Sequence, residues 1–94
     1  MTTYTRCDPD HQMAPIVNIN GTSRSVLVQQ RLDARRAIQA AMKALQELKP
    51  NGRDYIGHPD AMKRDLAIYS ARFADLDRIA NHLQDEALAL HYAS

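Results

Sequence analysis

The sequence predicts an all-α fold: an antiparallel two-helix hairpin with an irregular N-terminal arm, assembling into an oligomeric helical bundle. Two stretches, residues 27–48 and 62–90, place apolar side chains at alternating steps of three and four, which is the period of an amphipathic helix. All prolines and glycines lie before or between these stretches. The 94 residues are therefore expected to form one domain, with an arm over residues 1–21 and a hairpin over residues 22–94.

The arm is expected to be irregular. Pro9 and Pro15 disfavour helix, and only residues 15–19 (PIVNI) alternate like a short extended segment. Its apolar side chains have little local core to join, so we expect their order to depend on a partner chain. These side chains are Tyr4, Ile16, Val17 and Ile19.

The first helix is expected over about residues 23–48. The hydroxyl of Thr22 or Ser23 is suited to accept a hydrogen bond from an unpaired N–H of the first turn. The apolar stripe of this helix consists of Leu27, Arg31, Ala34, Ile38, Ala41, Leu45 and Leu48. Small side chains flank the stripe and would let another helix approach closely on a second side: Ala37, Ala40 and Ala44.

A connector over residues 49–59 separates the helices. Pro50, Asn51 and Gly52 end the first helix, and Pro59 suits the first position of the second, expected over about residues 60–91. A connector of this length returns the chain antiparallel. The second helix, about 45 Å long at 1.5 Å per residue, carries an uninterrupted stripe of Met62, Leu66, Tyr69, Phe73, Leu76, Ala80, Leu83, Ala87 and Leu90.

Two helices form a single layer, which leaves each apolar seam only half covered. Aromatic residues are 5% of the chain and tryptophan is absent, so large core side chains are scarce. We therefore expect a homo-oligomer, most simply a dimer that forms a four-helix bundle. The alternative is a monomeric three-element fold in which the arm covers the open face.

The charge, the single cysteine and the hydropathy of the chain limit the kinds of partner and compartment that we expect. The net charge of +1 does not favour a long nucleic acid, although residues 22–48 carry five basic and two acidic side chains and residues 60–94 carry four and six. The single cysteine, Cys7, excludes an internal disulfide and suits a reducing compartment. No stretch has the length of a membrane span or the apolar core of a signal peptide, so we expect a cytoplasmic protein without a membrane partner.

The start of the first helix is the first candidate site. Spacings of seven and four place Arg24, Arg31 and Arg35 on one side of the helix, and Thr22 and Ser23 add hydroxyls. Helix N-termini attract anions and guanidinium groups match phosphate oxygens, so this corner is a candidate phosphate site. For Arg31 the alternative is a salt bridge to an acid of the second helix, or extension of its charge to the bundle edge.

The connector is the second candidate site. Tyr55 can stack on a base while Arg53 and His58 meet phosphates, in the manner of single-nucleotide sites. The alternative is that Arg53 pairs with Asp54 and that Tyr55 packs on the helix ends. The two candidates lie about 40 Å apart along one hairpin, and an antiparallel dimer would bring them together at a subunit interface.

Catalytic and metal-binding patterns are weak. Cys7 and His11 are four residues apart but lack a second pair of ligands, and the chain has no Ser/His/Asp set, P-loop or dinucleotide fingerprint. We therefore expect a protein that is not an enzyme and has no catalytic residues, cofactor or metal.

Two short motifs carry a resemblance. Residues 18–23 (NINGTS) and 50–55 (PNGRDY), with the helices around them, resemble small helical-hairpin proteins of tailed phages and prophages of proteobacteria. The architecture is also similar to the phage counter-defence "sponge" proteins. That likeness implies a protein in the cytoplasm of an infected bacterium that sequesters a cyclic nucleotide or cyclic ADP-ribose signal. The alternatives are a protein-binding inhibitor of a host defence complex, of the anti-CRISPR or anti-restriction type, and a virion or assembly component.

Overall fold

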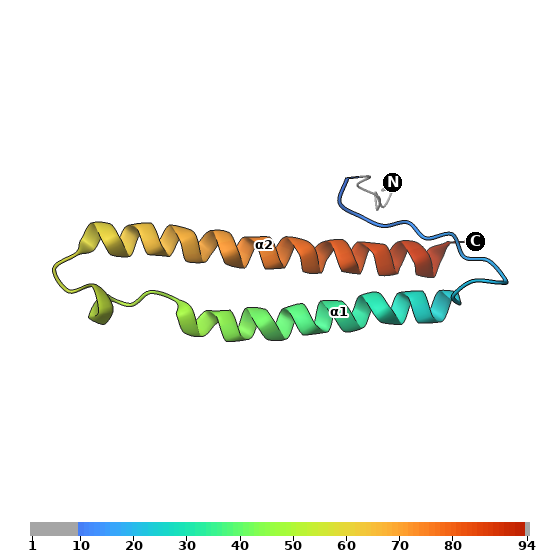
Figure 1. The fold of residues 1–94 in the computed structure, drawn as a ribbon, viewed down its shortest axis with the longest axis horizontal. Coiled ribbons are helices and arrows are strands. Elements are labelled where there is room, and N and C mark those ends of the chain that lie inside the picture. The colour runs from blue at the N-terminus through green and yellow to red at the C-terminus, as the bar shows by residue number, and fades with distance from the viewer. Residues whose placement is uncertain (1–9, 94) are drawn as a thin grey trace.

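The computed structural model describes residues 10–93 as an antiparallel pair of long helices (Figure 1). Helix α1 spans Arg24–Leu45 and helix α2 spans Pro59–Tyr92, and the 3₁₀ turns Gln46–Leu48 and Gly52–Tyr55 lie between them. No strand occurs among the described residues, so the all-α prediction is confirmed for this part of the chain. None of its helices has the length and apolarity needed to cross a lipid bilayer. Tyr4 and Cys7 lie outside the described residues.

The helix ends follow local chemistry. Ser23 caps α1, because its Oγ accepts a hydrogen bond from the backbone N–H of Val26 at 3.3 Å. α1 ends at Leu45, three residues before the expected end, because the chain tightens into a 3₁₀ turn before Pro50. α2 begins at Pro59, where the missing N–H costs no helical hydrogen bond.

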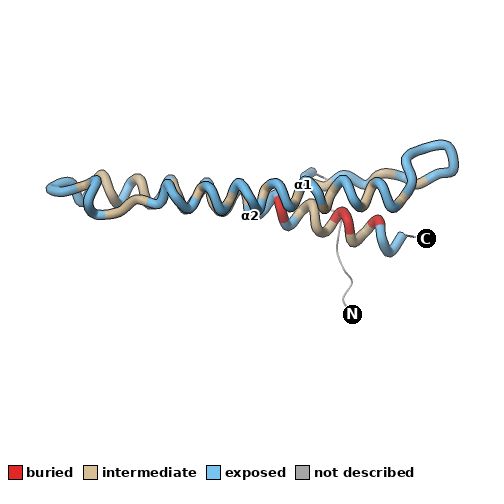
Figure 2. Tube along the Cα trace, turned by 90° about the horizontal axis from the view of Figure 1, so that it is seen from below, coloured by how far each residue is buried: buried red, intermediate tan, exposed pale blue. Residues whose placement is uncertain are grey.

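The apolar stripe of α2 is confirmed: all nine of its positions are half-buried or buried. Burial is uneven along the rod, however. Ala80, Ala87 and Leu90 are the only apolar side chains in the described part of the chain that are 5% exposed or less, and all three lie in the C-terminal half of α2 (Figure 2). The core of the single hairpin is therefore confined to its open end, opposite the connector.

The predicted stripe of α1 is wrong in part. Ala34 and Ala41 are exposed and Leu48 is 63% exposed, whereas Arg35 and Met42 take positions in the seam. Their long side chains cover more of the α2 surface than alanine can, which rotates α1 toward them. The half-buried seam of α1 consists of Arg24, Val28, Arg31, Arg35, Ile38, Met42 and Leu45, at alternating steps of four and three.

The hairpin is extended and leaves much of its surface open. Its extents are 63 × 26 × 21 Å and its radius of gyration is 18.3 Å, whereas a compact chain of this length has a radius of about 12 Å. The accessible surface is 7003 Å² for 10.6 kDa, compared with about 5,500 Å² for a typical folded monomer of that mass. The excess is about 1,500 Å² per chain.

Candidate functional site

The two predicted clusters lie at opposite ends of the hairpin, as their sequence spacing requires (Figure 1). Thr22, Ser23, Arg24, Arg31 and Arg35 belong to the open end, where α1 begins and α2 ends. The connector holds the second set at the closed end: Arg53, Tyr55 and His58. A single chain therefore keeps the clusters apart.

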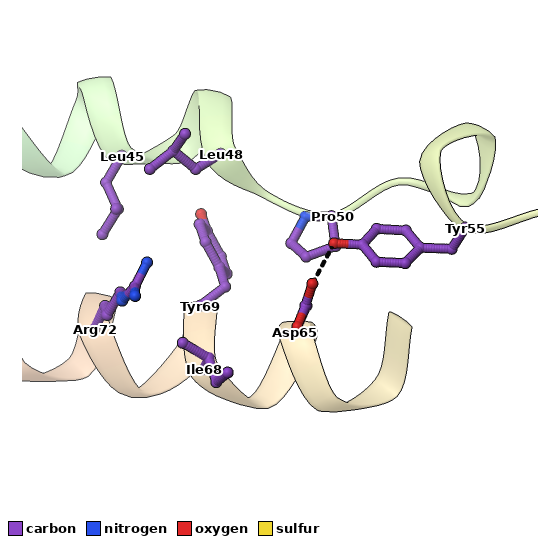
Figure 3. Close-up of a pocket in the computed structure, with 8 residues that line it drawn as sticks. All are labelled: Leu45, Leu48, Pro50, Tyr55, Asp65, Ile68, Tyr69 and Arg72. Atoms are coloured by element: carbon purple, nitrogen blue, oxygen red, sulfur yellow. Dashed lines mark hydrogen bonds between the residues drawn. The ribbon is translucent and has the colours of Figure 1, made fainter. Parts of the chain in front are cut away.

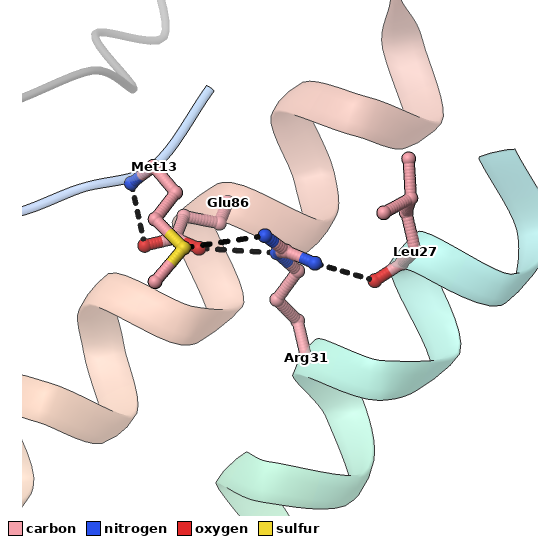
Figure 4. A network of polar contacts seen from close by, with 4 residues as sticks. All are labelled: Met13, Leu27, Arg31 and Glu86. Carbon is pink, nitrogen blue, oxygen red and sulfur yellow. Dashed lines mark hydrogen bonds and ion pairs between the residues drawn. The ribbon is translucent and has the colours of Figure 1, made fainter. Parts of the chain in front are cut away.

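A buried ion pair joins the helices at the open end (Figure 4). Arg31 Nε donates to Glu86 Oε1 at 3.1 Å, and the side chains are only 10% and 6% exposed. The arm completes the pair, because the backbone N–H of Met13 donates to Glu86 Oε2 at 3.0 Å. The other Arg31 nitrogens contact the Leu27 carbonyl at 3.3 Å and the Met13 sulfur at 3.7 Å. Each polar atom of the pair therefore has a partner inside the hairpin.

This network settles the choice between the two interpretations of Arg31. The guanidinium neutralises an acid of the second helix, so the salt-bridge interpretation is confirmed. A phosphate would have to displace Glu86, which would leave a buried carboxylate uncompensated. Arg31 therefore holds the hairpin together and has no nitrogen without a partner to offer a ligand.

Arg24 and Arg35 differ from Arg31. Both are half-buried in the seam, and the Nε of each is buried without a hydrogen-bond partner among the described residues. Arg35 borders an open recess of about 520 Å³ between the helices, lined by Val28, Leu32, Arg35, Gln84, Ala87, Leu88 and His91. A buried donor without a partner is costly, so these two side chains are the ones at this end suited to an additional acceptor.

The hydroxyls at the start of α1 have limited freedom. Ser23 Oγ accepts from Val26 N–H at 3.3 Å and lies 3.3 Å from Ser25 Oγ. Thr22 is exposed and precedes the capping residue. The predicted helix cap is thus confirmed for Ser23, and this hydroxyl already serves the helix.

Asn51 organises the connector. Its Oδ1 accepts from the backbone N–H of Arg53 at 3.0 Å and from Arg53 Nε at 3.2 Å. Its Nδ2 donates to Asp54 Oδ2 at 3.2 Å. Arg53 and Asp54 therefore bond to Asn51 instead of to each other, so the alternative of a direct Arg53–Asp54 pair is wrong. The Arg53 side chain is bent back onto its own turn.

Tyr55 packs between the connector and the start of α2 (Figure 3). Its hydroxyl donates to Asp65 Oδ2 at 2.7 Å. This bond lowers the pKa of Asp65 from its ordinary value of 3.8, helped by Arg64, and the same bond raises the pKa of Tyr55 above 10.0. The alternative in which Tyr55 packs on the helix end is thus confirmed. The ring is half-buried and forms one wall of a recess.

The signs of these shifts define a pH window. The folded-state pKa of Asp65 is lowered, so its contribution to stability is present above pH 3.8 and is lost as the pH falls through the lowered pKa. The folded-state pKa of Tyr55 is raised, so its contribution is present below pH 10.0 and is lost as the pH rises through the raised pKa. The connector contact is therefore complete at neutral pH.

His58 immediately precedes α2 and is exposed. Its backbone N–H donates to the Tyr55 carbonyl at 2.8 Å, and its carbonyl accepts from Met62 N–H at 3.2 Å. These bonds close the connector and begin the helix. His58 thus has a backbone role, while its ring faces solvent.

Sequence patterns missed the partners that decide the geometry. Glu86, Met13 and Asp65 belong to polar or irregular stretches, and no motif distinguished them. The useful signal was Arg31 itself, because a charge within an apolar seam requires an acid nearby. The pattern within one helix does not identify which acid on the other helix lies opposite.

Within residues 10–93, His, Cys, Asp and Glu side chains do not gather in any group of three or more that could hold a metal ion. The predicted site residues therefore form two separate polar corners, of which the open end retains unpartnered donors. The chain matches no protein-family model, and comparison with curated proteins and with solved structures finds no similar protein.

Proposed function

We propose that this chain is a non-enzymatic helical interaction protein whose working form is a homo-oligomer, most simply a dimer of hairpins in a four-helix bundle. The observation that carries the proposal is the accessible surface of the single chain, arm included, which is about 1,500 Å² more than a folded monomer of this mass exposes. Obligate homodimers bury a similar area on each chain. A second hairpin would cover the exposed flanks of both seams.

The charges of the two helices are unlike. α1 carries five basic side chains and one acidic one, whereas α2 carries four basic and six acidic ones. These opposite charges meet within each hairpin, where α1 packs on its own α2. When two hairpins stack antiparallel on one shared face, each α1 lies beside the α1 of the second copy, so the association depends on apolar contacts.

The test is the melting temperature as a function of protein concentration. For a folded dimer that dissociates as it unfolds, we expect the midpoint followed by circular dichroism to rise by about 3–5 °C for each tenfold increase in concentration. Dissociation makes unfolding depend on mass action, whereas a monomer unfolds independently of concentration. A midpoint that stays constant from about 1 to 100 μM would contradict the proposal.

A second candidate function is sequestration of a small phosphorylated, cyclic nucleotide signal, as expected of a phage counter-defence protein. The specific support is that the Nε atoms of Arg24 and Arg35 are buried and have no hydrogen-bond partner within residues 10–93. A phosphate oxygen is the acceptor that an arginine donor takes most readily. In the antiparallel dimer, Arg53 of the second copy would approach the same end and add a cation.

Titration calorimetry with cyclic dinucleotides, cyclic trinucleotides and cyclic ADP-ribose tests this candidate. We expect binding by the wild-type chain and loss of at least tenfold in affinity in the Arg24→Ala/Arg35→Ala variant, because each charged hydrogen bond contributes about 1.5–3 kcal/mol. The matched control is Arg36→Ala, since Arg36 lies on the same helix, is 72% exposed and bonds Asp33. No heat with any of these ligands, together with capture of a host defence complex, would favour the protein-binding alternative.

A further inference from the structure

Along α1 and the 3₁₀ turn that follows it, one side is more apolar than the other. It carries Leu27, Ala34, Ala41 and Leu48, which recur at steps of seven. We call this the arm-side face, because the arm crosses it at the open end, where Met13 reaches Glu86. On the opposite face, the corresponding positions are Ser25, Leu32, Gln39 and Gln46, of which only one is apolar. For this part of the chain, covering the arm-side face therefore removes more apolar surface from water.

The arm covers one end of the arm-side face and not the other. At the open end, Gln12 and Met13 of the arm bond to Asp85 and Glu86. At the connector end lies a partly open recess of about 290 Å³, which we call the connector recess (Figure 3). Its lining is largely apolar: Leu45, Leu48, Pro50, Tyr55, Asp65, Ile68, Tyr69 and Arg72.

The two most exposed large apolar side chains of the described residues lie in the arm, between Met13, which bonds to Glu86, and the start of α1. Ile16 is 84% exposed and Ile19 is 96% exposed, although Pro15 and Val17 between and beside them are half-buried. The arm is held at Met13 and rejoins α1 at Ser23, so its position is fixed at both ends. A tethered segment that presents two isoleucines to solvent is suited to a partner surface.

We propose that two hairpins pack antiparallel through the arm-side face, and that Ile16 and Ile19 of each arm enter the connector recess of the other copy. This inference rests on the proposed self-association and specifies its geometry. The arm cannot reach the recess of its own chain, because α1, about 33 Å long, separates them. An antiparallel second copy places its connector end over the open end, so each arm meets a recess.

The chemistry of the two surfaces matches. Leu45, Leu48 and Ile68 form apolar walls for the isoleucines, while Tyr55 and Asp65 already satisfy each other by a hydrogen bond. The Tyr55 hydroxyl therefore keeps its acceptor when the recess is covered. Ala34 and Ala41 at the middle of the face allow the two copies of α1 to approach closely between the two arm contacts.

The first test compares the dimer dissociation constants of Ile16→Ser/Ile19→Ser, Ile56→Ser and the wild type by sedimentation velocity. We expect the arm variant to weaken association at least tenfold, because two isoleucines lose their buried apolar contact. Ile56 is a matched control, since it is 81% exposed but is not part of the recess. Unchanged helicity by circular dichroism in the monomeric arm variant shows that the hairpin itself remains folded.

The second test is a disulfide between copies in a Cys7→Ser background. A chain with Ile19→Cys is mixed with a differently tagged chain with Leu48→Cys, and we expect the covalent heterodimer to predominate after oxidation. Disulfides only between identical chains would overturn the proposed contact.

The sedimentation experiment separates this inference from the proposed function. If the wild type is a dimer and the arm variant associates as strongly, the exchange of arms alone is overturned. A monomeric wild type would overturn the proposed function as well.

Discussion

Replacing Glu86 by alanine is expected to lower the free energy of unfolding by about 3 kcal/mol. The reason is that the change leaves the Arg31 guanidinium, only 10% exposed, without its carboxylate in the seam. The Met13 backbone N–H loses its acceptor at the same time, so the arm is released from α2. In urea, with a slope of about 1.5 kcal/mol per M, the midpoint would fall by about 2 M.

The control for this prediction replaces both partners. Arg31→Met combined with Glu86→Leu removes the two charges and keeps comparable volume, so we expect stability close to that of the wild type or above it. Both variants must be measured at one protein concentration, because association adds to stability. A Glu86→Ala variant as stable as the wild type would mean that water reaches the pair and that the ion pair is not buried in solution.

Replacing Leu90 by alanine is expected to cost about 2–3 kcal/mol of unfolding free energy. Leu90 is 5% exposed and is the largest of the three well-buried apolar residues in the described part of the chain. Alanine preserves helix propensity, so the loss reflects the missing contacts and the cavity left between α2 and the start of α1. Denaturant unfolding followed by circular dichroism at 222 nm measures the change.

Val26→Ala provides the comparison on the other helix. Val26 is 47% exposed and lies outside the seam, so its truncation is expected to change stability by less than about 0.5 kcal/mol. If Leu90→Ala were as mild as Val26→Ala, the last turn of α2 would be frayed in solution. The core at the open end would then be smaller than the structure indicates.

The two helices could be predicted from the sequence, but the side of α1 that packs on α2 could be predicted only in part. All nine stripe positions of α2 could be assigned because no proline or glycine interrupts the period. In α1 the same rule failed at Ala34 and Ala41, because Arg35 and Met42 cover more of the opposite helix. A pattern that classes each residue only as apolar or polar ignores the aliphatic part of an arginine side chain, which can be buried.

The register between the helices was also out of reach. If the expected end of the first helix, residue 48, lay opposite the expected start of the second, residue 60, Arg31 would lie opposite Asp77. In the structure Arg31 pairs with Glu86 instead. The reason is that the connector runs beside the first turns of α2 before the chain reverses, and Tyr55 holds it there by its bond to Asp65. Loop length alone predicts that the chain reverses, but side-chain contacts of the loop set the offset.

The candidate site shows the same limit. The spacing placed Arg24, Arg31 and Arg35 on one side of the helix, and the structure agrees that all three lie in one seam. Their different states depend on long-range neighbours, because Glu86 and the arm satisfy Arg31, whereas Arg24 and Arg35 each keep a buried Nε that has no partner in the described part of the chain. No local pattern contains that information.

Sedimentation equilibrium of the wild-type chain tests the central claim most directly, because it gives a mass without assuming a shape. At tens of micromolar we predict a dimer, with twice the chain mass of 10.6 kDa, that dissociates on dilution. A species of 10.6 kDa across this range that still unfolds cooperatively would contradict the claim. The hairpin would then be stable with its apolar flanks in water, and neither the bundle nor the exchange of arms would form.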